Sequence, residues 1–177
     1  MSGAALPLRF ASVAELEDFL SEPTPELSAD LAQAPGDIIV LGVAGKMGPT
    51  LAGLAKAAVP DRRVIGVARF SDPAVKDWLQ GRGVETIHCD LLDETAIKAL
   101  PKIPNIVFMA GRKFGAEGDL SLTWAMNSHV PALVAQAFST SRIVTFSTGC
   151  VYPFVPVDGK GASSRRSLRR IASAKVS

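Results

Sequence analysis

The 177-residue sequence contains no apolar run of the roughly 18–20 residues that a membrane-spanning helix needs. Its first twenty residues also lack a basic start followed by an apolar run, so we expect no secretory signal. It has only two cysteines, Cys89 and Cys150, without the CxxC spacing of redox and zinc sites. We interpret them as reduced thiols in a cytoplasmic protein. The two histidines, His88 and His129, show no metal-ligand spacing, and we predict no metal site.

Acidic residues are absent after Asp158, whereas six basic residues follow it. Without these six, the 19 basic residues of the chain fall to 13 against 17 acidic ones, so the remainder has a net charge of −4, compared with +2 for the whole chain. A nucleic-acid role would depend on this basic tail alone. The tail has no aromatic side chain that could stack on a base, so we do not expect nucleic-acid binding.

Residues 1–36 have the pattern of an α-helical lead-in. The stretch "SVAE" at Ser12–Glu15 fits a capping box, in which a serine hydroxyl and a glutamate carboxylate satisfy free backbone amides at a helix start. Thr24 followed by Pro25 predicts the start of a second helix, which we expect to end before Gly36.

From Ile38 onward, short continuous apolar runs alternate with helical patterns. Continuous runs are typical of parallel strands that are buried on both faces. Five such alternations predict an α/β fold, with a parallel sheet that carries helices on both faces. The predicted strands lie at 38–41, 64–68, 84–89, 105–110 and 142–147, and the predicted helices near 46–58, 72–81, 93–100 and 120–138.

Three evenly spaced glycines, Gly42, Gly45 and Gly48, lie between the first strand and the first helix. Such a turn suits the pyrophosphate of a dinucleotide: one glycine permits an unusual φ, one removes a side chain that would block the phosphate, and one lets the helix pack on the strand. The helix N-terminus then offers free amides to the anion. The spacing is GxxGxxG rather than GxGxxG, and neither the P-loop pattern nor G-x-S-x-G is present.

The end of the second predicted strand reads "VIGVARFSD", with Ala68 and Arg69 where an acidic residue would bind a ribose 2′-hydroxyl. A guanidinium can hold a 2′-phosphate, which a carboxylate would repel, so this position favours NADP over NAD. Lys46, inside the glycine turn, is a second cation that would assist, and its neighbour Met47 belongs to the same predicted cofactor contact. The alternative is that Arg69 is a solvated loop residue.

From about Asp37 to Pro153, the chain resembles the extended short-chain dehydrogenase/reductases of the NAD-dependent epimerase/dehydratase group. The resemblance rests on five motifs: "GVAGKMG", "CDLLD", "FMAG", "NSHVPALVAQA" and "FSTGCVYP". It implies a Rossmann-like, doubly wound parallel sheet of about five strands. It also implies site roles for residues outside the glycine turn. Asp90 and Leu91 would frame adenine, Ala110 and Gly111 would pass beneath the nicotinamide, and Asn127 would belong to the cofactor site.

The resemblance also implies hydride chemistry on a carbinol or ketone, often within a nucleotide sugar. In this family a tyrosine acts as general acid/base, a lysine four residues later lowers its pKa, and a serine or threonine orients the substrate. Thr148 matches the last of these. The only tyrosine of the chain is Tyr152, which matches a structural tyrosine of the family, and Pro156 stands four residues after it. We therefore predict a catalytically incomplete chain, whose alternative role is a non-catalytic dinucleotide-binding sensor or scaffold.

The predicted organisation is a helical lead-in at 1–36, a dinucleotide-binding domain at 37–158 and a basic tail at 159–177. The tail fits a disordered basic arm, a segment with a phosphorylation site at "RRSL", or the product of a frame change near Gly159. We favour the frame change or a truncated gene, because the composition shifts abruptly where the architecture of the family should continue. The expected partners are a dinucleotide and, in a completed chain, a small-molecule substrate; a homodimer is left open.

Overall fold

The computed structural model describes residues 7–112, 119–147, 152, 155–159 and 161. The chain divides into two units, Met1–Thr145 and Phe146–Ser177. The described residues of the second unit include a turn, in which the Gly159 N–H donates to the Pro156 carbonyl at 3.0 Å. All helices and strands of the described residues belong to the first unit.

The first unit is built on a five-stranded, fully parallel sheet with the strand order β3-β2-β1-β4-β5. The central strand β1 pairs with β2 on one side and with β4 on the other, so the chain proceeds outward from β1 in both directions. The α/β, Rossmann-like fold predicted from the sequence is confirmed. The strands are β1 (Ile38–Leu41), β2 (Val64–Ala68), β3 (Glu85–His88), β4 (Asn105–Phe108) and β5 (Arg142–Thr145).

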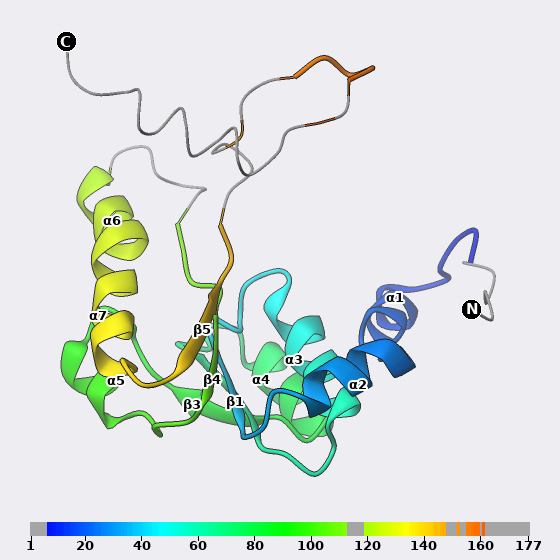
Figure 1. The fold of residues 1–177 in the computed structure, drawn as a ribbon, viewed down its shortest axis with the longest axis horizontal. Helices are drawn as coiled ribbons and strands as arrows, with labels where there is room; N and C mark the ends of the chain where they lie inside the picture. The colour runs from blue at the N-terminus through cyan, green and yellow to red at the C-terminus, as the bar shows by residue number, and fades with distance from the viewer. Residues whose placement is uncertain (1–6, 113–118, 148–151, 153–154, 160, 162–177) are drawn as a thin grey trace. The chain divides into compact units, whose positions relative to one another are not determined.

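Helices cover both faces of this sheet (Figure 1). One face carries the helices that follow β1 and β2, with part of the lead-in packed beside them, and the other face carries the helices that follow β3 and β4. The first group is α1 (Val13–Leu20), α2 (Pro25–Ala32), α3 (Gly48–Ala58) and α4 (Pro73–Gly81). The second group is α5 (Glu94–Ala99), α6 (Leu120–Trp124), the π-helical turn η1 (Ala125–His129) and α7 (Val130–Ala137).

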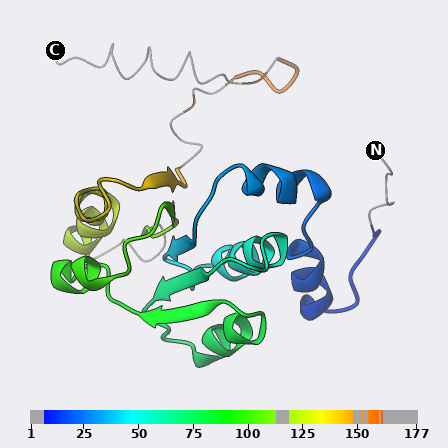
Figure 2. The ribbon, with the colours of Figure 1, turned by 60° about the horizontal axis from the view of Figure 1, so that its bottom comes forward.

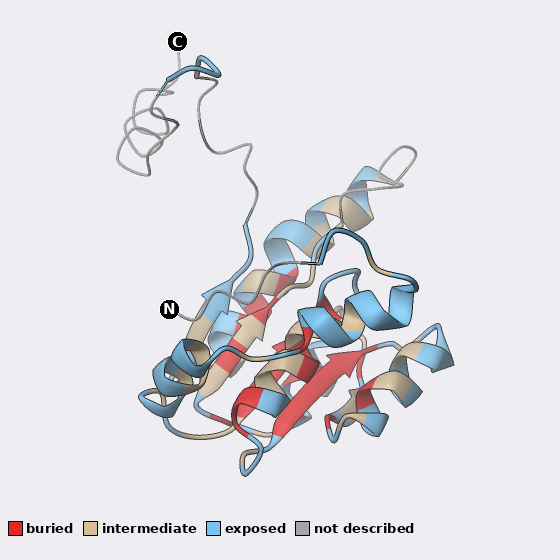
Figure 3. Ribbon diagram, turned by 90° about the vertical axis from the view of Figure 1, so that its right-hand side faces the viewer, coloured by how far each residue is buried: buried red, intermediate tan, exposed pale blue. Residues whose placement is uncertain are grey.

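The side chains of β1 alternate between two hydrophobic clusters. Ile38 and Val40 pack with α3 and α4, whereas Ile39 and Leu41 pack with α5 and α7. Every residue of β1 and β2 is buried, as the continuous apolar runs predict, and the buried residues concentrate on the strands and the helix faces turned toward them (Figure 3). The same prediction is wrong for β3 and β5, where no residue is fully buried. In the part of the chain that the structure describes, these two strands form the edges of the sheet and have a neighbour on one side only.

The lead-in helices begin at the predicted caps. The Ser12 hydroxyl accepts from the Glu15 amide at 3.1 Å, and the Thr24 hydroxyl accepts from the Leu27 amide at 3.2 Å. The Glu15 carboxylate accepts from the amide of Ala11 rather than from that of Ser12, so the capping box closes one residue earlier than predicted.

Backbone carbonyls before β1 converge on Asn105, at the start of β4. Its amide nitrogen lies 3.1, 3.2 and 3.0 Å from the carbonyl oxygens of Pro35, Gly36 and Asp37. These contacts tie the end of the lead-in to the amino edge of the sheet, opposite the edge where the strands end.

The prediction of one continuous helix at 120–138 is wrong, because the π-helical turn η1 separates α6 from α7. The amide of Val130 donates to the carbonyl of Ala125, five residues earlier. Pro131 follows and has no N–H to continue the ladder. Such π-turns occur frequently at functional sites, and this one contains Asn127.

Replacing Gly48 with alanine should destabilise the fold, because a Cβ there would lie 2.0 Å from the backbone carbonyl oxygen of Val43. Overpacking of this kind costs about 1–3 kcal/mol of unfolding free energy. Gly81→Ala is the matched control in α4, since nothing lies within 4 Å of the added Cβ. We expect the control to keep or slightly raise stability in urea unfolding. Equal midpoints for the two variants would contradict this account of the packing of α3.

Candidate functional site

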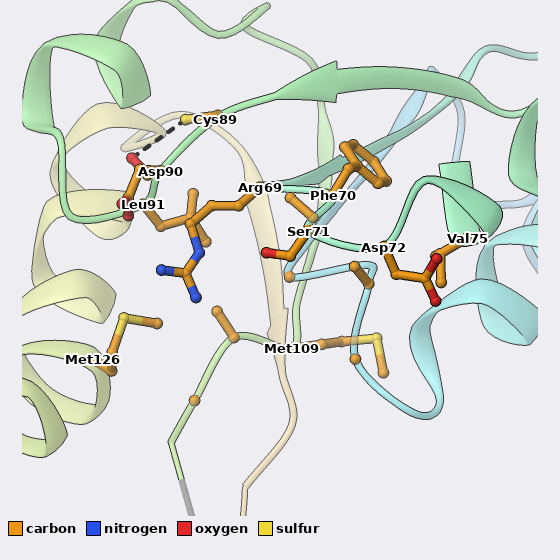
Figure 4. A pocket seen from close by; sticks show the side chains of 16 residues that line it. Arg69, Phe70, Ser71, Asp72, Val75, Cys89, Asp90, Leu91, Met109 and Met126 are labelled. Carbon is orange, nitrogen blue, oxygen red and sulfur yellow. Dashed lines mark hydrogen bonds between the residues drawn. The ribbon is translucent and has the colours of Figure 1, made fainter. Parts of the chain in front are cut away.

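A pocket of about 370 Å³ lies at the carboxyl ends of the central strands (Figure 4). It opens beside β1 and β4, where the chain connections diverge to opposite faces of the sheet. In open parallel sheets, ligands bind at this switch point. The lining residues are Gly42, Ala44, Gly45, Ala68, Arg69, Phe70, Ser71, Asp72, Val75, Cys89, Asp90, Leu91, Met109, Ala110, Gly111 and Met126.

The first and third glycines of the turn are required by the packing of the protein itself. Gly42 has a φ of +86°, and a Cβ there would lie 2.7 Å from the backbone nitrogen of Ala110. Gly48 lets the first turn of α3 pack directly on Val43, the second residue after β1. Together the two glycines bring the ends of β1 and β4 and the start of α3 close together.

The second glycine, Gly45, has a different environment. A Cβ built on it would meet only the Gly42 carbonyl oxygen, at an ordinary contact distance of 3.5 Å. The residue is exposed and lines the pocket, so the missing side chain leaves room on the pocket side. Among the described residues, no hydrogen-bond acceptor is found for the amides of Ala44, Lys46 and Met47. The turn therefore presents unpaired N–H groups next to the N-terminus of α3, an arrangement that suits an anion.

Arg69 follows β2 and extends into the pocket. Its guanidinium points toward the side where Leu91 and Met126 lie (Figure 4). Within the described part of the chain we find no ion pair or hydrogen bond for it. This side chain is therefore a cation available to a ligand in the pocket.

The next residue, Phe70, has a φ of +46°, the only positive φ of a non-glycine residue in the described part of the chain. Its ring packs against the cluster under α3 and α4. Strained backbone of this kind tends to occur at functional sites. After it, Ser71 and Asp72 also line the pocket, and one Asp72 carboxylate oxygen accepts from the Ala74 amide at 2.9 Å to cap α4.

The segment after β3 forms another wall of the pocket. A carboxylate oxygen of Asp90 accepts from the Leu92 amide at 3.0 Å, which shapes the turn that carries Leu91. Cys89 is 4% exposed, and burial, with a further effect of the Asp90 and Asp93 charges, raises the pKa of its thiol. The thiol therefore stays protonated near neutral pH and is not a ready nucleophile. No group of three or more His, Cys, Asp or Glu side chains that could hold a metal ion is found among the described residues.

Asn127, on η1, holds the loop that follows β4. Its side-chain oxygen accepts from the Arg112 amide at 2.7 Å, and its side-chain nitrogen donates to the Arg112 carbonyl at 2.8 Å. A Cβ on Gly111 would lie 3.4 Å from the same Asn127 oxygen. Asn127 does not line the pocket; it positions the loop that does.

The structure brings together most of the site residues predicted from the sequence, although their role as cofactor ligands stays a prediction. Gly48 and Asn127 do not line the pocket but contact the segments that form it. Lys46 and Met47 lie on the exposed turn beside the pocket. Thr148 lies outside the described residues. The predicted residues that line the pocket are Gly42, Gly45, Arg69, Asp90, Leu91, Ala110 and Gly111.

Sequence reasoning missed several lining residues. Ala44 lies between the first two glycines, so the turn motif could have indicated it. Ser71 and Asp72 follow Arg69 directly and could have been included with it. Met109 and Met126 carry no local signal, because only the tertiary fold brings their apolar side chains to the pocket.

This arrangement defines a dinucleotide-binding α/β domain, and comparisons with known proteins agree. The sequence model of the NAD dependent epimerase/dehydratase family matches residues 38–169. The chain belongs to this family, whose cofactor is a nicotinamide dinucleotide, and it contains the NAD(P)-binding domain. The match extends into the basic tail that begins at residue 159. No curated protein sequence shows significant similarity to the chain.

Solved structures show the same fold. The chain is similar to ADP-L-glycero-D-manno-heptose-6-epimerase of Helicobacter pylori, with a TM-score of 0.61 and 19% identity over 72% of this chain and 44% of that one. It is also similar to UDP-glucuronic acid 4-epimerase of Bacillus cereus, solved with UDP-glucuronic acid and NAD, with a TM-score of 0.55 and 21% identity over 68% and 42%. For L-threonine dehydrogenase of Phytophthora infestans the TM-score is 0.53, with 21% identity over 66% and 37%. The chain thus spans less than half the length of these structures. No helix in the described part of the chain is long and apolar enough to cross a membrane.

Replacing Asn127 with alanine should release the loop after β4. Loss of both hydrogen bonds to Arg112 should lower the free energy of opening this loop by about 1–2 kcal/mol. Exchange of the Arg112 amide hydrogen should therefore become roughly 10-fold faster. Ser128→Ala, at the exposed neighbouring position of η1, is the control and should leave that exchange rate unchanged. Unaltered protection of Arg112 in the Asn127→Ala variant would show that other contacts hold this loop.

Proposed function

We propose that the pocket binds NADP(H) and that the chain is the cofactor-binding part of an oxidoreductase of the epimerase/dehydratase type. The proposed substrate class is a nucleotide sugar or a similar carbinol or ketone. The observation that carries the proposal is the convergence of the glycine turn, Arg69 and the Asp90–Leu91 turn on one pocket at the switch point of the sheet. We also propose a cytoplasmic location, which rests on the two widely spaced cysteines.

In this proposal the pyrophosphate lies against the turn at Gly45, where the unpaired amides and the N-terminus of α3 face an anion. The Asp90–Leu91 turn frames the adenine. Ala110 and Gly111, held by Asn127, pass beneath the nicotinamide end. The bound cofactor supplies hydride transfer, and these residues orient it.

The choice of NADP over NAD rests on Arg69. Its guanidinium has no partner among the described residues and points into the pocket, which suits a 2′-phosphate. Asp72, three residues after Arg69, also lines the pocket, and its carboxylate caps α4.

Gly45→Ala should weaken binding of NADPH without unfolding the protein. The added methyl group has room within the protein but occupies the side on which the pyrophosphate is proposed to lie. We expect the dissociation constant to rise at least 10-fold, about 1.4 kcal/mol, in a titration followed by NADPH fluorescence. Gly81→Ala serves as the control. Unchanged affinity in Gly45→Ala would contradict the proposed position of the pyrophosphate.

Arg69→Ala should remove the preference for NADPH. Hydrogen bonds to charged groups contribute about 1.5–3 kcal/mol, so NADPH affinity should fall roughly 10- to 100-fold while NADH affinity changes little. Lys76→Ala removes one positive charge from the exposed side of α4, outside the pocket lining, and controls for the general electrostatic field. An equal loss of affinity for both cofactors would show that Arg69 does not recognise the 2′-phosphate.

We expect negligible turnover by the chain as it stands. Its single tyrosine, Tyr152, is followed four residues later by Pro156, so no lysine at that spacing can lower a tyrosine pKa. The measurement is NADP⁺ reduction with UDP-glucuronic acid, whose secondary alcohols can be oxidised, and NADPH oxidation with simple ketones. A rate above that of the protein-free control, lost in Tyr152→Phe, would contradict this expectation. Cofactor binding by a stable monomer or dimer without turnover would favour the alternative role of a sensor or scaffold.

A further inference from the structure

The side chains of β2 alternate between the two faces of the sheet. Ile65 and Val67 belong to the cluster under α5 and α7, whereas Val64 and Ala68 belong to the cluster under α3 and α4. This strand lies between β1 and β3, and the three strands end at the same edge of the sheet (Figure 2). The residues that follow Ala68 therefore enter the pocket with a defined side of the sheet for each side chain.

This alternation continues for two residues beyond the strand. Arg69 points toward the side of Leu91 and Met126, which contribute to the cluster under α5 and α7 (Figure 4). The ring of Phe70 packs against the other cluster, as Val75 of α4 also does. The two neighbouring side chains thus point to different sides. Arg69 is an exposed cation in the pocket, and Phe70 is a half-buried ring beside it.

Phe70 also ends the extended course of the chain. Its φ of +46° lies in the left-handed region, where a residue with a Cβ is strained. Glycine or asparagine would adopt this backbone at a lower cost, so the turn by itself does not call for phenylalanine. Such strain persists where surrounding contacts enforce it. Here these contacts are the packed ring and, two residues later, the Asp72 carboxylate that caps α4 at the Ala74 amide.

We infer that Phe70 is a positioning residue, which fixes the guanidinium of Arg69 at the cofactor 2′-phosphate and thereby sets the preference for NADPH. This inference rests on the proposed binding of NADPH in the pocket. Arg69 has no ion pair or hydrogen bond of its own among the described residues, so its direction depends on its backbone. That backbone is held by β2 before it and by the anchored ring after it. A side chain that is held in its binding position before the ligand arrives loses less entropy on binding.

Phe70 also lines the pocket, so a direct contact between its ring and the cofactor is the competing role. The adenine ring is common to NADH and NADPH, whereas the 2′-phosphate is present in NADPH alone. A phenylalanine that stacks on adenine would contribute equally to both affinities. A phenylalanine that acts through Arg69 contributes to the NADPH affinity alone, so the ratio of the two dissociation constants separates these roles.

The test compares Phe70→Gly with Phe70→Leu in the full chain, by fluorescence titration with each cofactor. Glycine keeps the left-handed backbone available and removes the ring, whereas leucine keeps an apolar side chain for the cluster. Phe70→Gly should raise the dissociation constant of NADPH roughly 10-fold and that of NADH less than about 2-fold. Phe70→Leu should stay within about 3-fold of the unsubstituted chain for both cofactors. Trp78→Leu is the control, because it removes another ring from the same cluster outside the pocket lining and should leave the ratio unchanged.

The dependence on Arg69 is tested by combining substitutions. In an Arg69→Ala background, Phe70→Gly should change the NADPH affinity less than about 2-fold, because the guanidinium that Phe70 positions is gone. A second readout needs no cofactor, since NMR relaxation of the Arg69 Nε–H group reports the mobility of the side chain. Phe70→Gly should make this group more mobile, and Trp78→Leu should leave its relaxation unchanged.

Equal losses of affinity for NADPH and NADH in Phe70→Gly would overturn the inference in favour of a direct contact. Unchanged NADPH affinity in that variant, additive losses in the double variant, or unaltered mobility of Arg69 would also overturn it. If Phe70→Gly loses the native circular dichroism spectrum, Phe70→Asn takes its place, because asparagine also tolerates the left-handed backbone. Failure of the proposed function has a different signature in chains that keep Phe70. There, the unsubstituted chain would not bind NADPH, or Arg69→Ala would bind it equally tightly, and this inference would fall with the proposed function.

Discussion

The close approach of the turn after β1 to the end of β4 is the constraint on which the rest of the site depends. Gly42 has no side chain and a left-handed backbone, so the two strand ends meet without a Cβ between them. Six residues later, Gly48 lets α3 start directly on the carbonyl of Val43. Any larger residue at either glycine would push α3 or β4 outward and open the base of the pocket.

Given this convergence, the walls of the pocket follow from the strand order. The ends of β2 and β3 carry Arg69 and the Asp90–Leu91 turn on one side, and the loop after β4 lies on the other. That loop is held by Asn127 from η1, where one extra residue in the helical turn precedes Pro131.

The lead-in illustrates a conflict between local pattern and tertiary packing. The sequence of α1 is amphipathic, and its apolar residues would ordinarily be assigned to the core. The structure instead buries Ser21 and leaves Leu20 half exposed, because Trp78 and Arg82 present a polar surface to the helix. Hydrogen bonds and an ion pair hold the helix on α3 and α4, and its apolar residues stay partly exposed.

The sequence alone determined the strands, the glycine turn and the helix caps, because each depends on interactions between residues a few positions apart. The apolar run at 38–41 and the caps at Ser12 and Thr24 are local features of this kind. The tertiary structure alone decided which strands are exposed edges, how Asn127 reaches Arg112 and that Met126 enters the pocket. It also decided that the apolar residues of α1 stay partly exposed. These features depend on contacts between segments far apart in the chain, and such contacts leave no periodic trace in the sequence.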